Sequence, residues 1–158
     1  MVSVSIPSEQ NNYLAEHVTL LFASYRYWTG IDLLPSQDDP VKIAEQIFYA
    51  PFAVMSHDTA VDPLFNYANQ ATLDLFEMDW GEFINLPSRE SAEPGNRQDR
   101  EKILGKVTTQ GFIDNYSGIR ISASGKRFRI KNAVIWNVLD NSGRLYSQAA
   151  AFPEWEYL

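Results

Sequence analysis

Residues 127–139 read RFRIKNAVIWNVL, and apolar side chains alternate with polar ones along this stretch. Neighbouring side chains of a β-strand point to opposite faces, so a period of two predicts a strand. This period places large apolar residues on a single face: Phe128, Ile130, Val134, Trp136 and Val138. Because a continuous apolar face is unfavourable in water, a helix, a partner or a small ligand must cover it.

Turn residues separate this stretch from the extended runs on either side of it. Residues 140–143 read DNSG, which suits a tight hairpin, and residues 144–152 form the returning strand. Residues 123–125 make a second hairpin with a strand at 112–122, in which Gly118 indicates a bulge. The C-terminal part is therefore predicted as an antiparallel meander.

Helical patterns dominate the earlier part of the chain. Apolar residues recur at three- and four-residue spacing within 9–29 and 40–50, with Ser8 and Asp39 as N-caps. Shorter elements follow, namely strands at 52–55 and 64–67 and helices at 70–76, 78–86 and 96–110, with Asn69 able to cap the first of these helices. The residues after 152 are expected to form a short tail.

This order of elements predicts an α+β fold with five antiparallel strands and the inserted helices on one face of the sheet. Residues 1–50 are expected to form an N-terminal helical extension, which serves packing or dimerisation. Residues 51–158 are expected to form the sheet domain, and the two parts together make one unit.

Composition narrows the classes of function. The chain has 158 residues, a formal net charge of −7 and no cysteine. An acidic body without a basic stripe disfavours nucleic-acid binding, and a chain without cysteine forms no disulfide or cysteine-bound metal site. The first nine residues lack the features of a signal peptide, and no apolar run reaches the length of a membrane span. We therefore expect a cytoplasmic protein that binds neither nucleic acid nor membrane.

Residues 64–71, LFNYANQA, resemble the second strand and the helix entry of a PAS domain. Further strings are similar to the MEKHLA domain, a PAS-related family of bacteria and of plant homeodomain–leucine zipper proteins. They are HV at 17–18, SY at 24–25, WTG at 28–30, LPSR at 86–89, SAEP at 91–94, QGFIDNYSG at 110–118 and GKRFRI at 125–130. The likeness runs from about Tyr13 to Phe152, but the string MEKHLA itself is absent, so the chain resembles a divergent or bacterial-type member.

The resemblance implies a PAS-like sensory or regulatory module with no defined catalytic activity. PAS-type domains enclose a small-molecule pocket between sheet and helices, transmit signals through flanking helices, and often pair through an N-terminal helix. In the plant proteins the domain is thought to regulate dimerisation. Because no output segment is recognised in this sequence, the signal is expected to leave through a protein partner or a second copy.

Seven residues are candidates for the wall of a ligand pocket: Tyr67, Phe76, Arg89, Tyr116, Asn132, Trp136 and Gln148. Asn132 falls in phase with the predicted apolar face, where an amide without a partner costs about 1–3 kcal/mol. Asn132 must therefore lie at a bulge or form hydrogen bonds with a backbone group, water or a ligand. Gln148 on the last strand likewise needs a partner for its amide. Trp136 and Tyr116 are either core residues or a stacking surface. Arg89 either ties its own loop by an ion pair or faces a ligand.

The first helix carries candidates for a dimer or partner interface: Leu14, Val18, Leu21, Tyr25 and Trp28. Packing of this apolar stripe on the chain's own domain is the alternative, and the sequence leaves both open.

Metal and cofactor chemistry is disfavoured by the residue types present. His17 and His57 are the only histidines, and a metal site usually needs two or three suitably spaced ligands. Haem-binding PAS domains place a histidine on the long helix before the last strands, and residues 96–110 contain none. Light-sensing flavin domains of this class form a cysteine adduct, so no covalent flavin is expected, while a noncovalent flavin stays open.

Two other functions compete with a sensor. One is a pure oligomerisation or adaptor module. The other is a small cofactor-independent enzyme with Asp114 as a buried base, although no convergent acid–base pair is recognisable and residues 88–91 have no nucleophile elbow.

Overall fold

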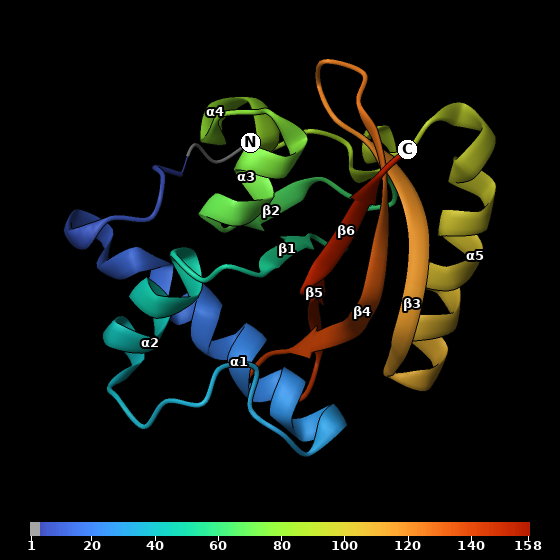
Figure 1. Cartoon of the computed structure of the whole chain (residues 1–158). Coiled ribbons are helices and arrows are strands. Elements are labelled where there is room, and N and C mark those ends of the chain that lie inside the picture. Colours follow the sequence, from blue (N-terminus) through green and yellow to red (C-terminus); the bar gives the residue numbers. More distant parts are fainter. Residues whose placement is uncertain (1–3) are drawn as a thin grey trace.

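A computed structural model describes residues 4–158, and its centre is a six-stranded antiparallel sheet (Figure 1). The strand order is β2-β1-β5-β4-β3, and the last strand, β6, also pairs with β4. The strands are β1 Ala53–His57, β2 Phe65–Ala68, β3 Phe112–Ile121, β4 Arg127–Leu139, β5 Leu145–Phe152 and β6 Glu154–Tyr157. The predicted α+β fold is confirmed. Residues 1–3, which belong to the predicted N-terminal extension and to the stretch judged not to be a signal peptide, lie outside the described residues.

Helices cover both faces of this sheet. They are α1 Ala15–Thr29, α2 Pro40–Phe48, α3 Gln70–Phe76, α4 Trp80–Phe83 and α5 Pro94–Gln110, with short 3₁₀ helices η1 Glu9–Leu14 and η2 Ser88–Ser91. Adjacent residues of β4 reach opposite layers, because Trp136 Nε1 donates to the Leu21 carbonyl of α1 at 3.2 Å and Asn137 Nδ2 donates to the Val107 carbonyl of α5 at 3.1 Å. The sheet therefore lies between α1 on one side and α5 on the other.

A bulge at Asn132 divides β4 into two segments of opposite phase. Gly118 of β3 pairs with Ile130 of β4, and the next pair is Tyr116 with Ala133. The two pairs are two residues apart in β3 but three residues apart in β4, so β4 contains one extra residue. Asn132 has a φ of 53°, is exposed, and donates from Nδ2 to Glu154 Oε1 at 3.2 Å. The prediction of an inward-facing Asn132 is therefore wrong, and the bulge is the alternative that holds.

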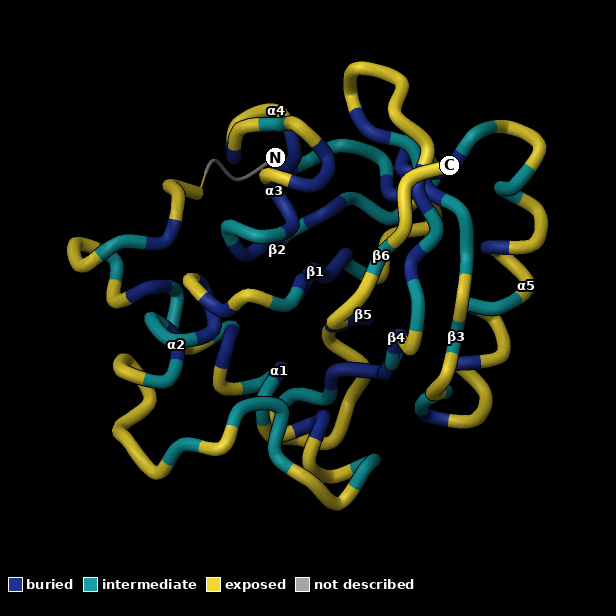
Figure 2. The backbone as a smooth tube through the Cα atoms, viewed as in Figure 1, coloured by how far each residue is buried: buried dark blue, intermediate teal, exposed yellow. Residues whose placement is uncertain are grey.

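The extra residue also corrects the predicted apolar face of β4. Phe128 packs against Phe76 of α3, with ring centroids 5.2 Å apart. Trp136 instead packs against Tyr25 of α1, with centroids 4.9 Å apart, so it lies on the face opposite to Phe128. Both faces of β4 carry large buried side chains because both are covered, and Figure 2 shows the buried residues in the sheet and the exposed ones along the outer side of α5.

The C-terminal residues contribute a strand that the sequence analysis assigned to a tail. Pro153 interrupts the chain after β5, and β6 then pairs with Phe128–Lys131 of β4, beyond the segment that β5 occupies.

The predicted bulge near Gly118 is confirmed, because the register of β3 and β4 shifts between Tyr116 and Gly118.

Candidate functional site

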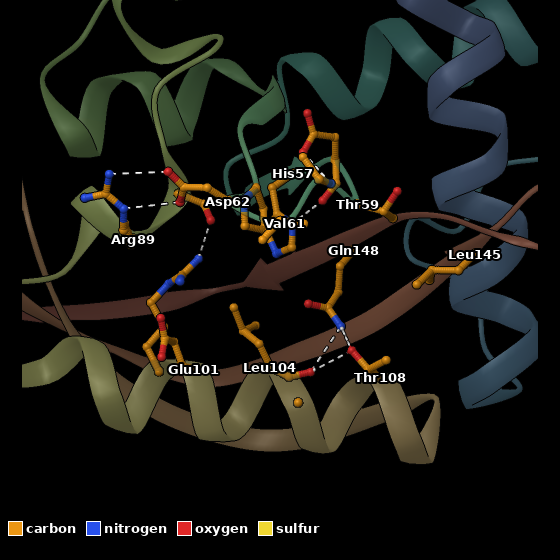
Figure 3. A pocket seen from close by; sticks show the side chains of 16 residues that line it. His57, Thr59, Val61, Asp62, Arg89, Glu101, Leu104, Thr108, Leu145 and Gln148 are labelled. Carbon is orange, nitrogen blue, oxygen red and sulfur yellow. Dashed lines mark hydrogen bonds and ion pairs between the residues drawn. The ribbon is translucent and has the colours of Figure 1, made fainter.

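A cleft opens between α5 and the loop that joins β1 to β2 (Figure 3). Its volume is about 410 Å³, within the usual range of small-molecule sites. Its wall is contributed by the β1–β2 loop, η2, α5 and β5, and includes His57, Val61, Arg89, Leu104, Thr108 and Gln148. The cleft therefore combines apolar and hydrogen-bonding groups.

An inner cavity of about 30 Å³ lies next to this cleft, between α5 and the sheet. Four residues line both spaces: His57, Arg100, Leu104 and Gln148. The rest of the inner wall is largely apolar, and it includes Met55, Phe65, Ile130, Ile135 and Ala150. A cavity of this size holds about one water molecule.

The sequence of α5 explains how a charged residue reaches the inner cavity. Pro94 occupies the first turn, and Gly111 ends the helix with a φ of 98°. Arg100, Leu104 and Val107 follow at spacings of four and three, so they share the face of the helix that lies on the sheet. This stripe is apolar except for Arg100.

Arg100 and Arg120 are buried without a carboxylate partner. Their exposed fractions are 6% and 5%, and neither forms an ion pair with any residue between 4 and 158. Arg100 Nη2 donates to Ser88 Oγ at 2.7 Å. Burial, together with the nearby positive charge of Arg120, lowers the pKa of Arg100 to about 10.

The guanidinium of Arg120 is only partly satisfied. Its Nη1 donates to the Ile119 carbonyl at 2.9 Å and its Nη2 to the Tyr116 hydroxyl at 3.3 Å, and the group stands 5.7 Å from the centroid of the Tyr116 ring. Its Nε has no hydrogen-bond partner among the described residues. An unpaired buried charge is expensive, so this pair of arginines calls for a physical explanation.

His57, at the end of β1, is a second incompletely paired group in the same wall. It is 8% exposed, its Nδ1 lies 2.8 Å from the Asp58 carbonyl, and its Nε2 has no partner in the described part of the chain. Burial lowers the pKa of His57, which favours the neutral ring. A neutral ring that donates from Nδ1 leaves Nε2 free to accept a hydrogen bond.

Two of the predicted pocket residues line the cleft. Gln148 Nε2 donates to Asn137 Oδ1 at 3.0 Å and to the Leu104 carbonyl at 3.3 Å, which answers the question of its polar partner. Arg89 makes a two-pronged contact with Asp62, at 3.2 and 3.3 Å, so its charge is already paired.

The other predicted pocket residues lie outside both spaces. Tyr116 lines neither space, but its hydroxyl accepts a hydrogen bond from Arg120, which lines the inner cavity. Phe76 packs against Phe128. Tyr67 is fully buried near the ring of His17, 5.6 Å away between centroids. Because of the bulge, Asn132 is exposed and Trp136 packs against α1. Arg100, Arg120 and His57 were not predicted from the sequence as pocket residues, although the charge of Arg100 within the apolar stripe of α5 is a signal that the sequence contains.

The candidates for a partner interface on α1 are largely used within the chain. Val18, Leu21 and Tyr25 are buried, because α1 lies on the sheet. Trp28 is partly buried and donates from Nε1 to the Asn137 carbonyl at 2.8 Å, and Leu14 packs at the edge of the core. Packing on its own domain is therefore the role that the structure gives to most of this stripe.

The remaining hypotheses concern a buried acid–base residue, a metal site and a membrane span. Asp114 is exposed, so it is not the buried base that the enzyme hypothesis requires. No group of three or more potential metal-ligating histidine, cysteine or carboxylate residues occurs among residues 4–158. None of the helices in this part of the chain has the length and apolar character needed to cross a membrane.

Solved structures with a similar fold belong to PAS and light-oxygen-voltage domains. A PAS domain from Colwellia psychrerythraea matches with a TM-score of 0.63 and 13% identity, over 74% of this chain and 94% of that one. An RNA-binding light-oxygen-voltage receptor matches with a TM-score of 0.63 and 21% identity, over 75% of this chain and 34% of that one. These similarities establish a PAS-like fold.

Sequence comparisons identify relatives among plant proteins. Homeobox-leucine zipper protein HOX10 of Oryza sativa subsp. indica is 28% identical over 137 residues, and ATHB-15 of Arabidopsis thaliana is 25% identical over 136. Each match covers 85% of this chain but only 16% of the relative. The model of the MEKHLA domain matches residues 15–157, which is nearly the whole chain. This chain therefore belongs to the MEKHLA domain family.

Proposed function

We propose that this PAS-like domain acts without catalysis, binding a small molecule in the cleft beside α5 and passing its state to a protein partner. The observation that carries the proposal is that the cleft and an inner cavity share a wall, which holds His57, whose Nε2 is unpaired, and Arg100, which has no carboxylate partner among residues 4–158. A site prepared for a ligand is expected to leave such groups unsatisfied when it is empty.

Direct contacts connect the cleft to α1 on the opposite face of the sheet. Gln148 lines the cleft and donates to the side chain of Asn137, and the backbone carbonyl of Asn137 accepts the bond from Trp28 of α1. A ligand that displaced Gln148 would therefore act on the C-terminal turn of α1. This supports α1 as the element that reports occupancy.

A second connection runs through β1. Two successive residues of β1 contact opposite sides of the sheet. His57 lines the cleft, whereas Ser56 Oγ lies 3.0 Å from His17 Nε2 of α1. Two residues that are neighbours in the backbone thus contact the ligand space and the opposite helix. A change in the position of His57 is therefore expected to affect the contact between Ser56 and His17.

Native mass spectrometry of the chain purified from its own host tests the ligand part of this proposal. We expect a retained mass that disappears on mild activation of the complex. Amide hydrogen exchange then tests the output, and α1 should exchange at different rates in the loaded and empty forms. A chain that is empty in every preparation and shows one exchange rate for α1 would contradict the proposal.

An oligomerisation or adaptor module remains the second candidate. Tyr27 and Ile31, near the end of α1, have exposed fractions of 70% and 63%, so apolar surface is available beside the proposed output helix. Sedimentation equilibrium of the chain and of its Tyr27→Ser, Ile31→Ser double variant tests it. A mass that rises with concentration only in the unmodified chain favours a dimer through this surface.

A further inference from the structure

The unpaired charges in the inner cavity identify the class of ligand, given the proposed function. Arg100 enters from α5 and Arg120 from β3, and both line the same cavity of about 30 Å³. Two cations that repel each other inside a protein are unfavourable unless an anion lies between or beside them. In the chain itself no carboxylate reaches them among the residues described.

We propose that the inner cavity binds the carboxylate of a small organic acid, held by Arg100 and Arg120, while the body of the acid occupies the cleft. A guanidinium presents parallel N–H donors that match a planar carboxylate. The unpaired Nε of Arg120 and the single side-chain bond of Arg100 leave donors available for it. His57 Nε2 adds an acceptor for a hydroxyl or amine on the body of the acid.

The dimensions of the two spaces favour a carboxylate over larger groups. The inner cavity is only about 30 Å³, so a flat carboxylate enters it with less rearrangement of the wall than a tetrahedral phosphate. A flavin ring system far exceeds it. The cleft of about 410 Å³ accepts the remainder of a small acid, and Leu104 supplies an apolar surface in both spaces.

The carboxylates near the cleft do not neutralise the buried arginines. Asp58 Oδ1 accepts hydrogen bonds from two backbone N–H groups of its own loop, and Asp62 is paired with Arg89. Glu101 is exposed on α5 at the outer wall. These carboxylates lie at the entrance of the cleft. The cleft is therefore expected to prefer an acid long enough for its carboxylate to lie beside the inner arginines rather than beside these groups.

Thermal unfolding with a series of defined probes tests this assignment. The probes are acetate, lactate, butyrate and benzoate, with lactamide and benzamide as uncharged counterparts and inorganic phosphate as a second anion. At about 100 times its dissociation constant, a bound acid should raise the Tm by roughly 5–10 °C, in a saturable manner. The amides and phosphate should give no saturable shift.

Variants connect the shift to the two arginines. Arg100→Met and Arg120→Met should each weaken binding of the active acid by about 10-fold or more, as expected for a lost charged hydrogen bond. Lys102→Met removes the same charge from an exposed position of α5, and its affinity should stay within about 2-fold. If Arg100→Met fails to fold, the conservative Arg100→Lys, which keeps the charge but lacks the planar fork, serves in its place.

The outcomes separate this inference from the proposed function. No saturable shift with any carboxylate, or a shift that Lys102→Met abolishes as fully as Arg100→Met, overturns the carboxylate assignment. A response to phosphate alone also overturns it. In each of these cases a ligand of another class, retained in native mass spectrometry, would still support the sensory function.

Discussion

Asn132 Nδ2 donates to Glu154 Oε1 across 3.2 Å, and this contact joins the bulge of β4 to the first residue of β6. The bulge directs Ile130 and Ile135 to the side of the inner cavity while Trp136 turns toward α1. One additional residue in β4 thus decides which side chains surround the candidate site and which ones hold the N-terminal helix.

The left-handed backbone of Asn132 predicts how substitutions at this position behave. With a φ of 53°, Asn132→Gly should leave the free energy of unfolding within about 0.5 kcal/mol, because glycine adopts this conformation without strain. Asn132→Val should lose roughly 1–2 kcal/mol or more, since a β-branched side chain is strained there. Urea denaturation measures both values.

The neighbouring Lys131 supplies the matched control for this prediction. Lys131→Val introduces the same side chain at a position of negative φ and removes only an exposed ion pair with Glu156. It should change the free energy of unfolding by about 0.5 kcal/mol or less. Equal losses for the two valine variants would show that backbone strain at Asn132 is not the cause.

Asn69 is predicted to be among the most sensitive polar positions of the chain. Its Oδ1 accepts from the Val54 amide at 3.0 Å and from both the amide and the hydroxyl of Thr72. Its Nδ2 donates to the Ile47 and Phe52 carbonyls at 3.0 and 2.8 Å. Asn69→Ala leaves these groups unpaired in the core and should lower the free energy of unfolding by roughly 3–5 kcal/mol.

Comparison with Asn69→Asp separates the donors from the acceptors of this residue. The aspartate keeps the shape and the accepting oxygen but faces two carbonyls with no donor, so it should destabilise the fold strongly near neutral pH. Gln70→Ala, at the half-buried next position, removes only the side-chain bond to Asp74 and should cost less than about 1 kcal/mol. Denaturation curves of the three variants check the ranking, and an Asn69→Asp protein as stable as the parent would disprove it.

The sequence predicted most of the fold because local signals agree with the final structure. Asp39 and Asn69 accept the N-cap hydrogen bonds expected of them, and the turn at 140–143 joins β4 to β5. The single error with wide consequences was the phase of β4. A fixed period of two does not reveal an inserted residue, although asparagine is a residue type enriched at positive φ.

The candidate site was less predictable, for physical reasons that differ between its residues. Arg100 could be recognised as a charge within an apolar stripe of a helix. Arg120 could not, because the register of β3 against β4 shifts between Tyr116 and Gly118, so the sequence pattern did not reveal which side of β3 would face α5. His57 is near Arg100 only after β1 and α5 pack, so its role is a property of the tertiary structure.

Two glycines in one region are predicted to respond to alanine with opposite signs. Gly111, with a φ of 98°, lies against the ring of Trp28, and a Cβ there would collide with it. Gly111→Ala should therefore lower the free energy of unfolding by roughly 2–4 kcal/mol. Gly105, inside α5, has no neighbouring atom within 4 Å of the position that a Cβ would occupy. Gly105→Ala should therefore raise the free energy of unfolding by about 0.5–1 kcal/mol.

Calorimetry of the two alanine variants measures both effects under one condition. The loss at Gly111 combines strain of the backbone with the collision, so Gly111→Ala in a Trp28→Ala background should lose less than in the parent chain. A destabilisation that is the same in both backgrounds would leave backbone strain as the whole cause and remove the predicted contact with Trp28.

His17 gives the folded chain a dependence on acid pH. Its ring nitrogens lie 2.9 Å from the Tyr146 hydroxyl and 3.0 Å from Ser56 Oγ, and burial lowers its pKa from 6.5 to about 4. Above pH 6.5 the ring is neutral in both states. As the pH falls from 6.5 toward 4, the unfolded chain takes up a proton that the folded chain does not, so stability is lost across this window.

The difference between the parent chain and His17→Gln isolates this contribution from that of the carboxylates. We expect the stability advantage of the parent to shrink by about 1–3 kcal/mol between pH 7 and pH 4, with the lower end reflecting partial exposure of the ring. Urea unfolding at intervals of about half a pH unit measures it, since carboxylates and His57 titrate alike in both proteins. An advantage that stays constant across the series would mean that His17 is protonated in the folded state as readily as in the unfolded one, and burial beneath Tyr146 would then have no effect on its charge.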